Sequence, residues 1–391
     1  MQDGDLAAWL RLTLTPGVGS SAARRLLAAF GWPSALFTQS AIALRQVVSA
    51  AQTSALLAEP PDFASKLRTA QAWLAQDPAQ HAIVPLGDAR YPPSLLAIED
   101  PPVLLYLAGR IDLLQAHGWP TRSLAMVGAR NPTPQGSQNA RDFARAFAAG
   151  GVCVVSGLAL GIDGAAHAGA LAAFDTSPNT PPAALATLAV AGTGIDRVYP
   201  RQHRDLAHRI VACGLLISEY PLGTPPLATN FPKRNRIIAG LTQGALVVEA
   251  ALQSGSLITA HLAVEQGKDV FAIPGSIHSP LSRGCHALIR QGAKLVETAQ
   301  DVLEELRWPF GVDPAVPAPP PDNTANATAP PASGVEDPLL QAFGADPAGL
   351  DALLARTGLD TATLQARLLE LELAGHVARL PGGLFQRIGR G

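Results

Sequence analysis

The sequence predicts an α/β protein with a parallel sheet at its centre, a helical region before it and a winged helix after it. Three observations support this prediction. From Ser123 onward, short apolar runs of the kind found in buried strands alternate with amphipathic helical patterns. Residues 1–80 have apolar residues at helical spacing, and residues 336–391 show three helical patterns followed by two strand patterns. Alternating strands and helices are typical of a doubly wound sheet with helices on both faces.

Four helices are expected in residues 1–80, because apolar residues recur at helical spacing between breaks at Pro16, Gly31 and Pro33. They cover Asp5–Leu12, Ser21–Phe30, Ala41–Val48 and Asp62–Gln76. Between the first two, Leu14–Gly19 resembles the turn of a helix-hairpin-helix module, whose backbone N–H groups face a DNA phosphate. A plain turn between two helices explains this short motif equally well. We therefore predict a helical domain over 1–80 that is SAM-like or helix-hairpin-helix-like.

The central domain is expected over residues 81–307. Residues 81–120 are interrupted by prolines and contain one convincing strand, at Val103–Leu107. The strands of the parallel sheet are expected at Leu124–Val127, Val152–Val155, Leu185–Ala191, Leu215–Ile217, Ala245–Val248, Val270–Ile273 and Leu295–Val296. The helices between them are expected at Gln135–Ala149, Asp163–Ala173, Gln202–Cys213, Asn235–Leu241, Leu257–Gln266 and Gly284–Arg290.

The composition shifts to Pro, Ala and Asn after Arg307, so residues 308–335 are expected to form a linker. A winged helix is expected over 336–391, because three helices and a hairpin follow one another there. They cover Pro338–Phe343, Leu350–Thr357, Asp360–Ala374, His376–Leu380 and Leu384–Ile388. This domain has 5 arginines and 7 acidic residues, which argues against binding to duplex DNA. Folds of this kind also serve as protein-contact modules.

Charge is unevenly distributed along the chain, although the net charge is only −2. Residues 121–300 carry 15 basic and 10 acidic groups, whereas residues 301–391 carry 6 and 12. A polyanion would therefore bind the centre of the chain. The three cysteines have no metal-ligand spacing and fit a reducing compartment. The start of the chain lacks signal-peptide features and the longest apolar run is too short to span a bilayer, so a cytoplasmic protein without a membrane partner is expected.

Basic residues follow the ends of several predicted strands, at the edge where open parallel sheets bind ligands. The stretch Ser218–Thr242 loses all periodicity and becomes ordered again at Asn235–Leu241, which predicts a helix entrance there. Free N–H groups at a helix entrance bind phosphate, and arginine adds a bidentate grip. A solvated basic loop would have the same composition. The basic residues on this predicted rim are Arg130, Arg201, Lys233, Arg234 and Arg236.

Several enzyme classes are disfavoured. The chain has no P-loop motif, and its first strand-to-helix turn, GARNPTPQG, lacks the dinucleotide-binding glycine pattern. Asp163 and His167 lie four residues apart on one expected helix, but without a third ligand a capping Asp and a packed His are the simpler reading. Glu249 ends a buried strand, and an arginine of the rim is its expected partner. No catalytic pair, metal site or cofactor is predicted.

An ordered series of motifs in the centre of the chain resembles the DNA-processing protein A family (DprA, also called Smf). The motifs are VGARNPTPQG (127–136), SGLALGID (156–163), AVAGTGIDRVYP (189–200), SEYPLGTPPLATNFPKRNRIIAGLT (218–242), VVEAALQSGSLITA (247–260) and VFAIPGSIHSPLSRGCHALIRQGA (270–293). The resemblance implies an extended Rossmann-like core, a homodimer, and a role in natural transformation. Such a protein binds incoming single-stranded DNA and loads the RecA recombinase on it.

The resemblance also implies which residues contact DNA. They are Arg130, Arg201, Lys233, Arg234, Asn235 and Arg236, with Gly255 and Ser256 beside them. The chain departs from the family pattern at Ala129 and at His203. It also departs at Cys285 and His286, the pair of positions where Thr-Asn or a close variant is usual. The last departure puts the sugar or phosphate contacts near the 270–293 motif in doubt.

Two alternatives come from other classes. Related Rossmann-like proteins hydrolyse nucleoside monophosphates with a PGGxGTxxE motif. Here Pro274–Ile277 lacks the second glycine, the threonine and the catalytic glutamate of that motif. A purely structural scaffold would not need basic residues at several strand ends. A DNA-binding protein without enzymatic activity is therefore the prediction.

Overall fold

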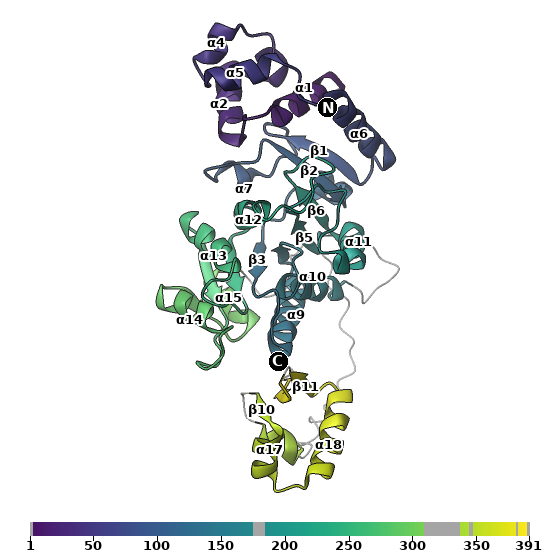
Figure 1. Ribbon diagram of the computed structural model, residues 1–391, viewed down its shortest axis with the longest axis vertical. Coiled ribbons are helices and arrows are strands. Elements are labelled where there is room, and N and C mark those ends of the chain that lie inside the picture. Colours follow the sequence, from purple (N-terminus) through teal and green to yellow (C-terminus); the bar gives the residue numbers. More distant parts are fainter. Residues whose placement is uncertain (1–2, 175–183, 309–336, 344–346, 381, 389–391) are drawn as a thin grey trace, which may run out of the picture.

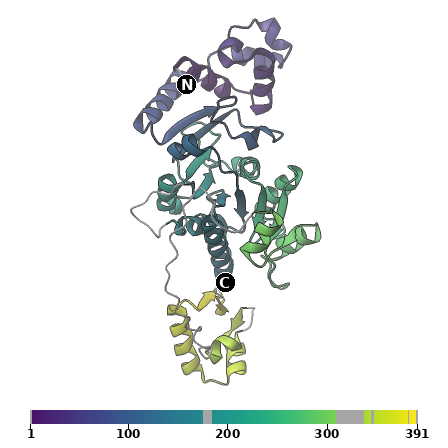
Figure 2. The same cartoon turned by 180° about the vertical axis from the view of Figure 1, so that it is seen from behind.

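A computed structural model of the protein describes residues 3–174, 184–308, 337–343, 347–380 and 382–388. The N-terminal helices lie at one end of the molecule, the sheet in the middle and the C-terminal domain at the other end (Figures 1 and 2). The predicted linker 308–335 falls, apart from Trp308, outside the described residues. In the part of the chain that is described, no helix is long and apolar enough to cross a membrane.

The N-terminal region is helical, as predicted. Its helices are α1 (Asp3–Leu14), α2 (Ser20–Phe30), α3 (Pro33–Leu36), α4 (Ala41–Arg45), α5 (Ala50–Leu57) and α6 (Phe63–Gln76). The sequence analysis missed α3 and α5. Ser49 begins α5 with a capping box, in which its hydroxyl accepts from the Gln52 N–H and the Gln52 side chain accepts from the Ser49 N–H. The residues 15–19 form the turn between α1 and α2, and its contact with DNA stays a prediction.

A nine-stranded sheet forms the core of the described part, in the order β1-β2-β6-β5-β4-β3-β7-β8-β9. The strands are β1 (His81–Pro85), β2 (Leu104–Gly109), β3 (Ser123–Val127), β4 (Cys153–Ser156), β5 (Thr187–Val190), β6 (Leu215–Ser218), β7 (Gly244–Val247), β8 (Asp269–Ala272) and β9 (Lys294–Leu295). All pairs from β6 to β9 are parallel, which confirms the predicted fold class. The pairs β1–β2 and β2–β6 are antiparallel and extend one edge.

Helices cover both faces of this sheet. The remaining elements are α7 (Pro93–Leu96), α8 (Ile111–His117), α9 (Pro134–Ala149), α10 (Ile162–Ala172), the 3₁₀ turn η1 (Arg201–His203), α11 (Arg204–Cys213), α12 (Asn230–Gly240), α13 (Ser256–Glu265), α14 (Arg283–Arg290) and α15 (Ala299–Glu305). Helices α7, α8, α12, α13 and α14 share one hydrophobic cluster with one face. Helices α9, α10 and α15 pack on the other face.

The N-terminal helices share their core with the sheet. One hydrophobic cluster joins Trp9 and Leu26 of these helices to Tyr106 of β2 and Ile210 of α11. Strand alternation explains how β2 serves two clusters, because Leu105 and Leu107 point to the opposite face. The domain boundary at residue 80 stays a prediction, and residues 1–80 pack firmly on the residues that follow.

The C-terminal domain is a winged helix, as predicted. It consists of α16 (Pro338–Ala342), β10 (Ala348–Gly349), α17 (Leu350–Thr357), α18 (Thr361–Leu373), β11 (Val377–Leu380) and β12 (Leu384–Arg387). The strands form a sheet in the order β10-β12-β11. Leu353, Leu364 and Phe385 lie in its own hydrophobic cluster, so this domain has a separate core.

Candidate nucleic-acid interface

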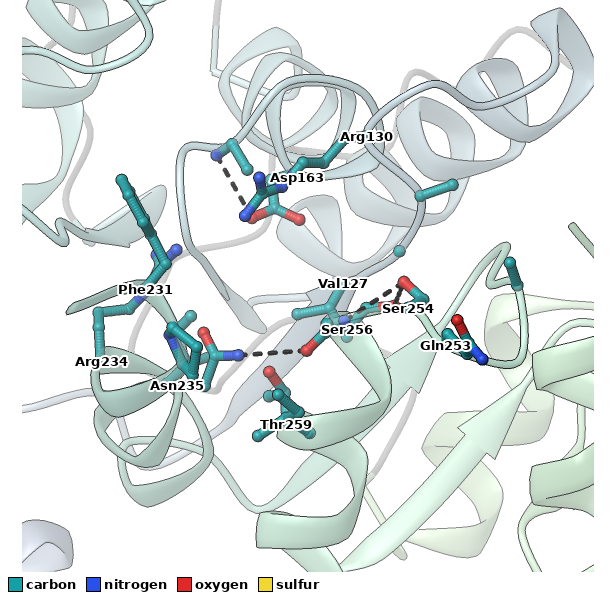
Figure 3. Close-up of a pocket in the computed structure, with 18 of the residues that line it drawn as sticks. Val127, Arg130, Asp163, Phe231, Arg234, Asn235, Gln253, Ser254, Ser256 and Thr259 are labelled. Carbon is teal, nitrogen blue, oxygen red and sulfur yellow. Dashed lines mark hydrogen bonds between the residues drawn. The ribbon is translucent and has the colours of Figure 1, made fainter. Parts of the chain in front are cut away.

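A pocket of about 690 Å³ lies where the direction of the sheet order reverses, beside the carboxyl ends of β3 and β7. The chain proceeds from β3 through β4 and β5 to one side, and β7 and β8 lie on the other side of β3. Open α/β sheets bind their ligands at this crevice. Figure 3 shows the loop after β3, helix α12 and the start of α13 around the pocket.

Helix α12 begins five residues earlier than the sequence predicted. It starts at Asn230, so Lys233–Arg236 lie inside the helix and not at its entrance. The reason is Pro232, which was read as part of an irregular stretch. A proline is tolerated in the first turn of a helix, because the N–H that it lacks would have no partner there. Successive side chains therefore point in different directions around α12, about 100° apart.

Arg234 lies in the floor of the pocket with only 4% of its surface exposed. Its guanidinium donates to the carbonyl oxygen of Val190, at the end of β5, and its Nε has no hydrogen-bond partner among the described residues. Burial lowers the pKa of Arg234 to about 10, and the charge of Asp163 partly offsets this effect. Gly157 makes room for the side chain, because a Cβ there would overlap the guanidinium.

Asp163 is a buried carboxylate close enough to Arg234 for the two charges to influence each other, without a salt bridge between them among the described contacts. Its Oδ2 accepts the N–H groups of Gly157 at 3.1 Å and Ala159 at 3.4 Å, which holds the loop after β4 against α10. Burial raises the pKa of Asp163, and the nearby Arg234 opposes that shift. The prediction that Asp163 caps its helix is wrong, because α10 begins after Gly161 without a side-chain cap and Asp163 binds N–H groups of the preceding loop instead.

His167 is a packed histidine, as expected. Its Nδ1 lies 2.8 Å from the hydroxyl of Thr187, which itself donates to the Val154 carbonyl, so Nδ1 carries the proton. The pKa of His167 is lowered to about 3 by burial and by the nearby His203 and Arg234. The imidazole is neutral in the folded state.

We expect this histidine to make the fold less stable in mild acid. The unfolded imidazole binds a proton below about pH 6.5, whereas the folded one stays neutral down to its depressed pKa. Stability should therefore fall as the pH drops from 6.5 toward 3, by about 1.4 kcal/mol per pH unit at most. Urea unfolding of wild type and His167→Gln at pH 7, 6 and 5 measures this contribution. Equal pH slopes for the two proteins would contradict it.

An aromatic and cationic ledge lies at the mouth of the pocket. The rings of Tyr199 and Phe231 lie 5.5 Å apart, and the Arg130 guanidinium lies 5.8 Å from the Phe231 ring centre. Arg130 is exposed, and Tyr199 exposes 48% of its surface. The ledge thus offers both a positive charge and a flat apolar surface to a ligand in the pocket.

The opposite wall of the pocket is the start of α13. Asn235 on α12 donates to the Gly255 carbonyl at 3.3 Å, and the hydroxyls of Ser254 and Ser256 lie 2.7 Å apart (Figure 3). The N-cap residue Gly255 provides no side-chain cap, and the N–H groups of Ser256 and Leu257 donate to the hydroxyl and the carbonyl of Ser254. The start of α13 therefore offers an anion the positive end of its dipole. The sequence analysis did not find Gln253 and Thr259, which also line this wall, because neither residue carries a charge.

The prediction that an arginine pairs with Glu249 is wrong. The Glu249 carboxylate accepts the N–H of Thr133 at 2.9 Å and its hydroxyl at 2.6 Å, at the N-terminus of α9. A helix N-terminus offers the positive dipole end that a carboxylate needs, so no arginine is required. Burial raises the pKa of Glu249, and the two Thr133 hydrogen bonds partly offset the shift.

The predicted site residues fall into three groups. Arg130, Arg234, Asn235, Gly255 and Ser256 line the pocket. Lys233 and Arg236, together with Tyr220, line a second groove of about 720 Å³ between α2 and the sheet. Arg201 is exposed on η1 and is not among the residues that line either cavity in the described structure. Arg234 and Arg236 point to different sides of α12, because they are two residues apart on a helix. The basic stretch in the sequence did not reveal this difference.

Of the departures from the family pattern, Ala129 lines the pocket, whereas His203, Cys285 and His286 are not among its lining residues and have structural roles. His203 Nδ1 lies 3.0 Å from the Leu158 carbonyl, and its ring packs on Gly164, so it supports the loop after β4. Cys285 is completely buried. His286 Nε2 lies 3.0 Å from the Gly275 carbonyl, which ties α14 to the loop after β8. Within the described ranges, no three His, Cys, Asp or Glu side chains gather into a metal site.

Comparison with known families identifies the chain. Residues 82–307 match the family model for DNA recombination-mediator protein A, and residues 318–383 match the model for the DprA winged helix domain. Among curated proteins, Protein Smf of Escherichia coli (strain K12) is 41% identical over 340 residues, which cover 85% of each chain. The DNA processing protein DprA of Streptococcus pneumoniae is 46% identical over 221 residues, covering 56% of this chain and 73% of its own.

A solved structure agrees with the sequence matches. The X-ray structure of DNA processing protein A from Streptococcus pneumoniae superimposes with a TM-score of 0.61 at 34% identity. The alignment covers 80% of this chain and 99% of that chain. The likeness therefore extends beyond the residues that line the pocket.

Proposed function

The chain belongs to the DNA recombination-mediator protein A family, and from this premise we propose that it binds single-stranded DNA in the pocket beside β3 and β7. It acts there as a binding protein of natural transformation that protects incoming strands and loads the RecA recombinase on them. It does so as a cytoplasmic homodimer. The name of the matching family supports the mediator role, and the pocket supports the ligand.

One observation carries this proposal. Two arginines, an aromatic pair and the positive dipole end of α13 converge on a single pocket. The arginines and the helix N-terminus attract phosphate, and bases stack on the aromatic pair. A nucleotide chain presents phosphate and base alternately, so it matches all three at once.

The geometry also suggests how a strand would lie. Arg130 at the mouth and the positive dipole end of α13 are placed to bind phosphates, which carry no sequence information. An unpaired base would stack on Phe231 or Tyr199, and stacking tolerates every base. A base inside a duplex does not expose its face for such stacking. We therefore expect a strong preference for single strands with little preference for base composition.

The nucleotide-hydrolase alternative receives less support. Asp163 is the one carboxylate among the described residues that line the pocket, and it accepts two loop N–H groups. Glu249 is engaged with the start of α9. A general base needs a carboxylate that can reach the substrate.

We expect the full-length protein to bind short single-stranded oligonucleotides with an affinity that falls steeply with salt. Each phosphate neutralised by the protein contributes a slope of about −0.7 to log K against log salt concentration, because counterions are released. Fluorescence anisotropy with labelled oligo-dT at several salt concentrations measures this slope. A flat salt response would remove phosphate binding from the proposal.

Competition and activity controls complete this experiment. Unlabelled mixed-sequence single strands should displace the probe as well as oligo-dT does, and duplex of equal length should compete poorly. Equal competition by duplex would contradict the preference for single strands and would make the winged helix the candidate for DNA binding. Release of base or phosphate from nucleoside monophosphates would favour the hydrolase. Co-purification of the full-length chain with RecA tests the loading role.

A further inference from the structure

An ion-pair network lies on the side of α12 that faces away from the pocket. Arg236 donates two parallel hydrogen bonds to the Glu219 carboxylate, at 2.7 Å from Nη1 and 2.6 Å from Nη2. Glu219 follows β6 directly. Both side chains are largely buried, with 14% and 12% of their surface exposed. A bidentate arginine–carboxylate pair fixes the orientation of both groups and is among the strongest charge-assisted contacts.

The network continues to the N-terminal helices through Asp100. The Nε of Arg236 donates to the Asp100 carbonyl at 2.9 Å and to its carboxylate at 3.1 Å. The same carboxylate forms an ion pair with Arg24 of α2, which also donates to the carbonyls of Glu99 and Pro101 at 3.1 Å. Asp100 thus joins α2 to α12. All three nitrogen atoms of the Arg236 guanidinium donate to protein groups.

Helix α12 itself links this network to the DNA pocket. Arg234 and Asn235 line the pocket, while Arg236 lies one helical step further and lines the groove on the other side. The far end of α12 is also held, because the Lys268 ammonium donates to the carbonyls of Ala239 and Gly240. A shift of α12 would move Arg234 and Asn235 relative to β5 and α13. The placement of these two side chains therefore depends on the contacts that fix α12 on the side facing away from the pocket.

We propose that Arg236 is a positioning residue, which fixes α12 and the pocket residues on it by binding Glu219 and Asp100 and does not contact the DNA. This inference rests on the proposed binding of single-stranded DNA to the pocket. It replaces the role that the family resemblance implied for Arg236. It also makes the N-terminal helices part of the support of the binding site, since Arg24 holds Asp100 from the other side.

Removal of the Glu219 charge tests the proposal, because the two possible roles of Arg236 predict opposite changes in DNA affinity. If Arg236 bound phosphate, removal of the competing Glu219 charge would free it and strengthen DNA binding. If Arg236 positions α12, Glu219→Gln should instead weaken binding by about three- to tenfold, the range in which residues without ligand contact act on affinity. Oligo-dT affinity of the full-length protein, measured by anisotropy, gives the sign. Glu265→Gln is the matched control, because it removes the same charge from an exposed site at the end of α13.

A second variant protects the test against a folding defect. Asp100→Asn removes a more exposed charge from the same network and should weaken binding in the same direction, by about twofold or more. Near-UV circular dichroism checks that both variants are folded at the assay temperature. Binding of either folded variant that equals or exceeds that of Glu265→Gln would overturn the proposal. Failure of the wild-type protein to bind oligo-dT would instead overturn the proposed function.

Discussion

Replacing Arg130 with alanine is expected to weaken the binding of single-stranded DNA by about ten- to a hundredfold, the loss of one charge-assisted contact. The same substitution should change the free energy of unfolding by less than about 0.5 kcal/mol, as is usual for exposed positions. Arg130 is exposed at the mouth of the pocket, and its side chain rests only against the Phe231 ring at 5.8 Å among the contacts of the described residues. Its charge is therefore free to meet a phosphate.

Arg141→Ala is the matched control for this substitution. Arg141 is an exposed arginine on α9, in the same basic part of the chain but outside the residues that line the pocket. Its loss should lower the affinity only slightly, through the weaker long-range field of the protein. Equal losses for the two variants would mean that the overall charge binds DNA and that the pocket has no special part.

The sequence predicted the sheet well because strand patterns are local. Each run such as Leu124–Val127 is apolar and continuous, as expected for a strand covered on both faces, and all predicted parallel strands are confirmed to within two residues. Strand β1 was missed because His81–Pro85 is short and ends in proline. It pairs only with β2 at the edge of the sheet, where a proline is tolerated.

The site was harder to predict, because it depends on side-chain direction. Arg234 and Arg236 are two residues apart and looked equivalent in the basic stretch. The early start of α12 turns one toward Val190 and Asp163 and the other toward Glu219. Asp100 lies far away in the sequence, so no local pattern could reveal its contact with Arg236. Tyr199 and Phe231 are more than thirty positions apart in the sequence, so no local pattern could reveal that their rings meet at the pocket, whereas Tyr220 lines the other groove.

The other large effect is expected from Arg234. Arg234→Met keeps most of the side-chain volume but leaves the buried Asp163 carboxylate without the positive charge close to it. A carboxylate that is left buried without a nearby positive charge destabilises the folded state. We therefore expect a strong loss of stability in urea unfolding, together with a loss of DNA binding by the folded fraction.

The double variant Arg234→Met/Asp163→Asn separates the two effects. The asparagine carbonyl can still accept from the Gly157 N–H, and no charge remains buried, so more than half of the lost stability should return. DNA binding should not return, because the positive charge in the pocket floor is still missing. The double-mutant cycle is completed by Asp163→Asn alone, which leaves Arg234 as the unpaired charge. Wild-type affinity in the stable double variant would show that Arg234 only supports the fold, and no recovery of stability would show that Asp163 does not depend on Arg234.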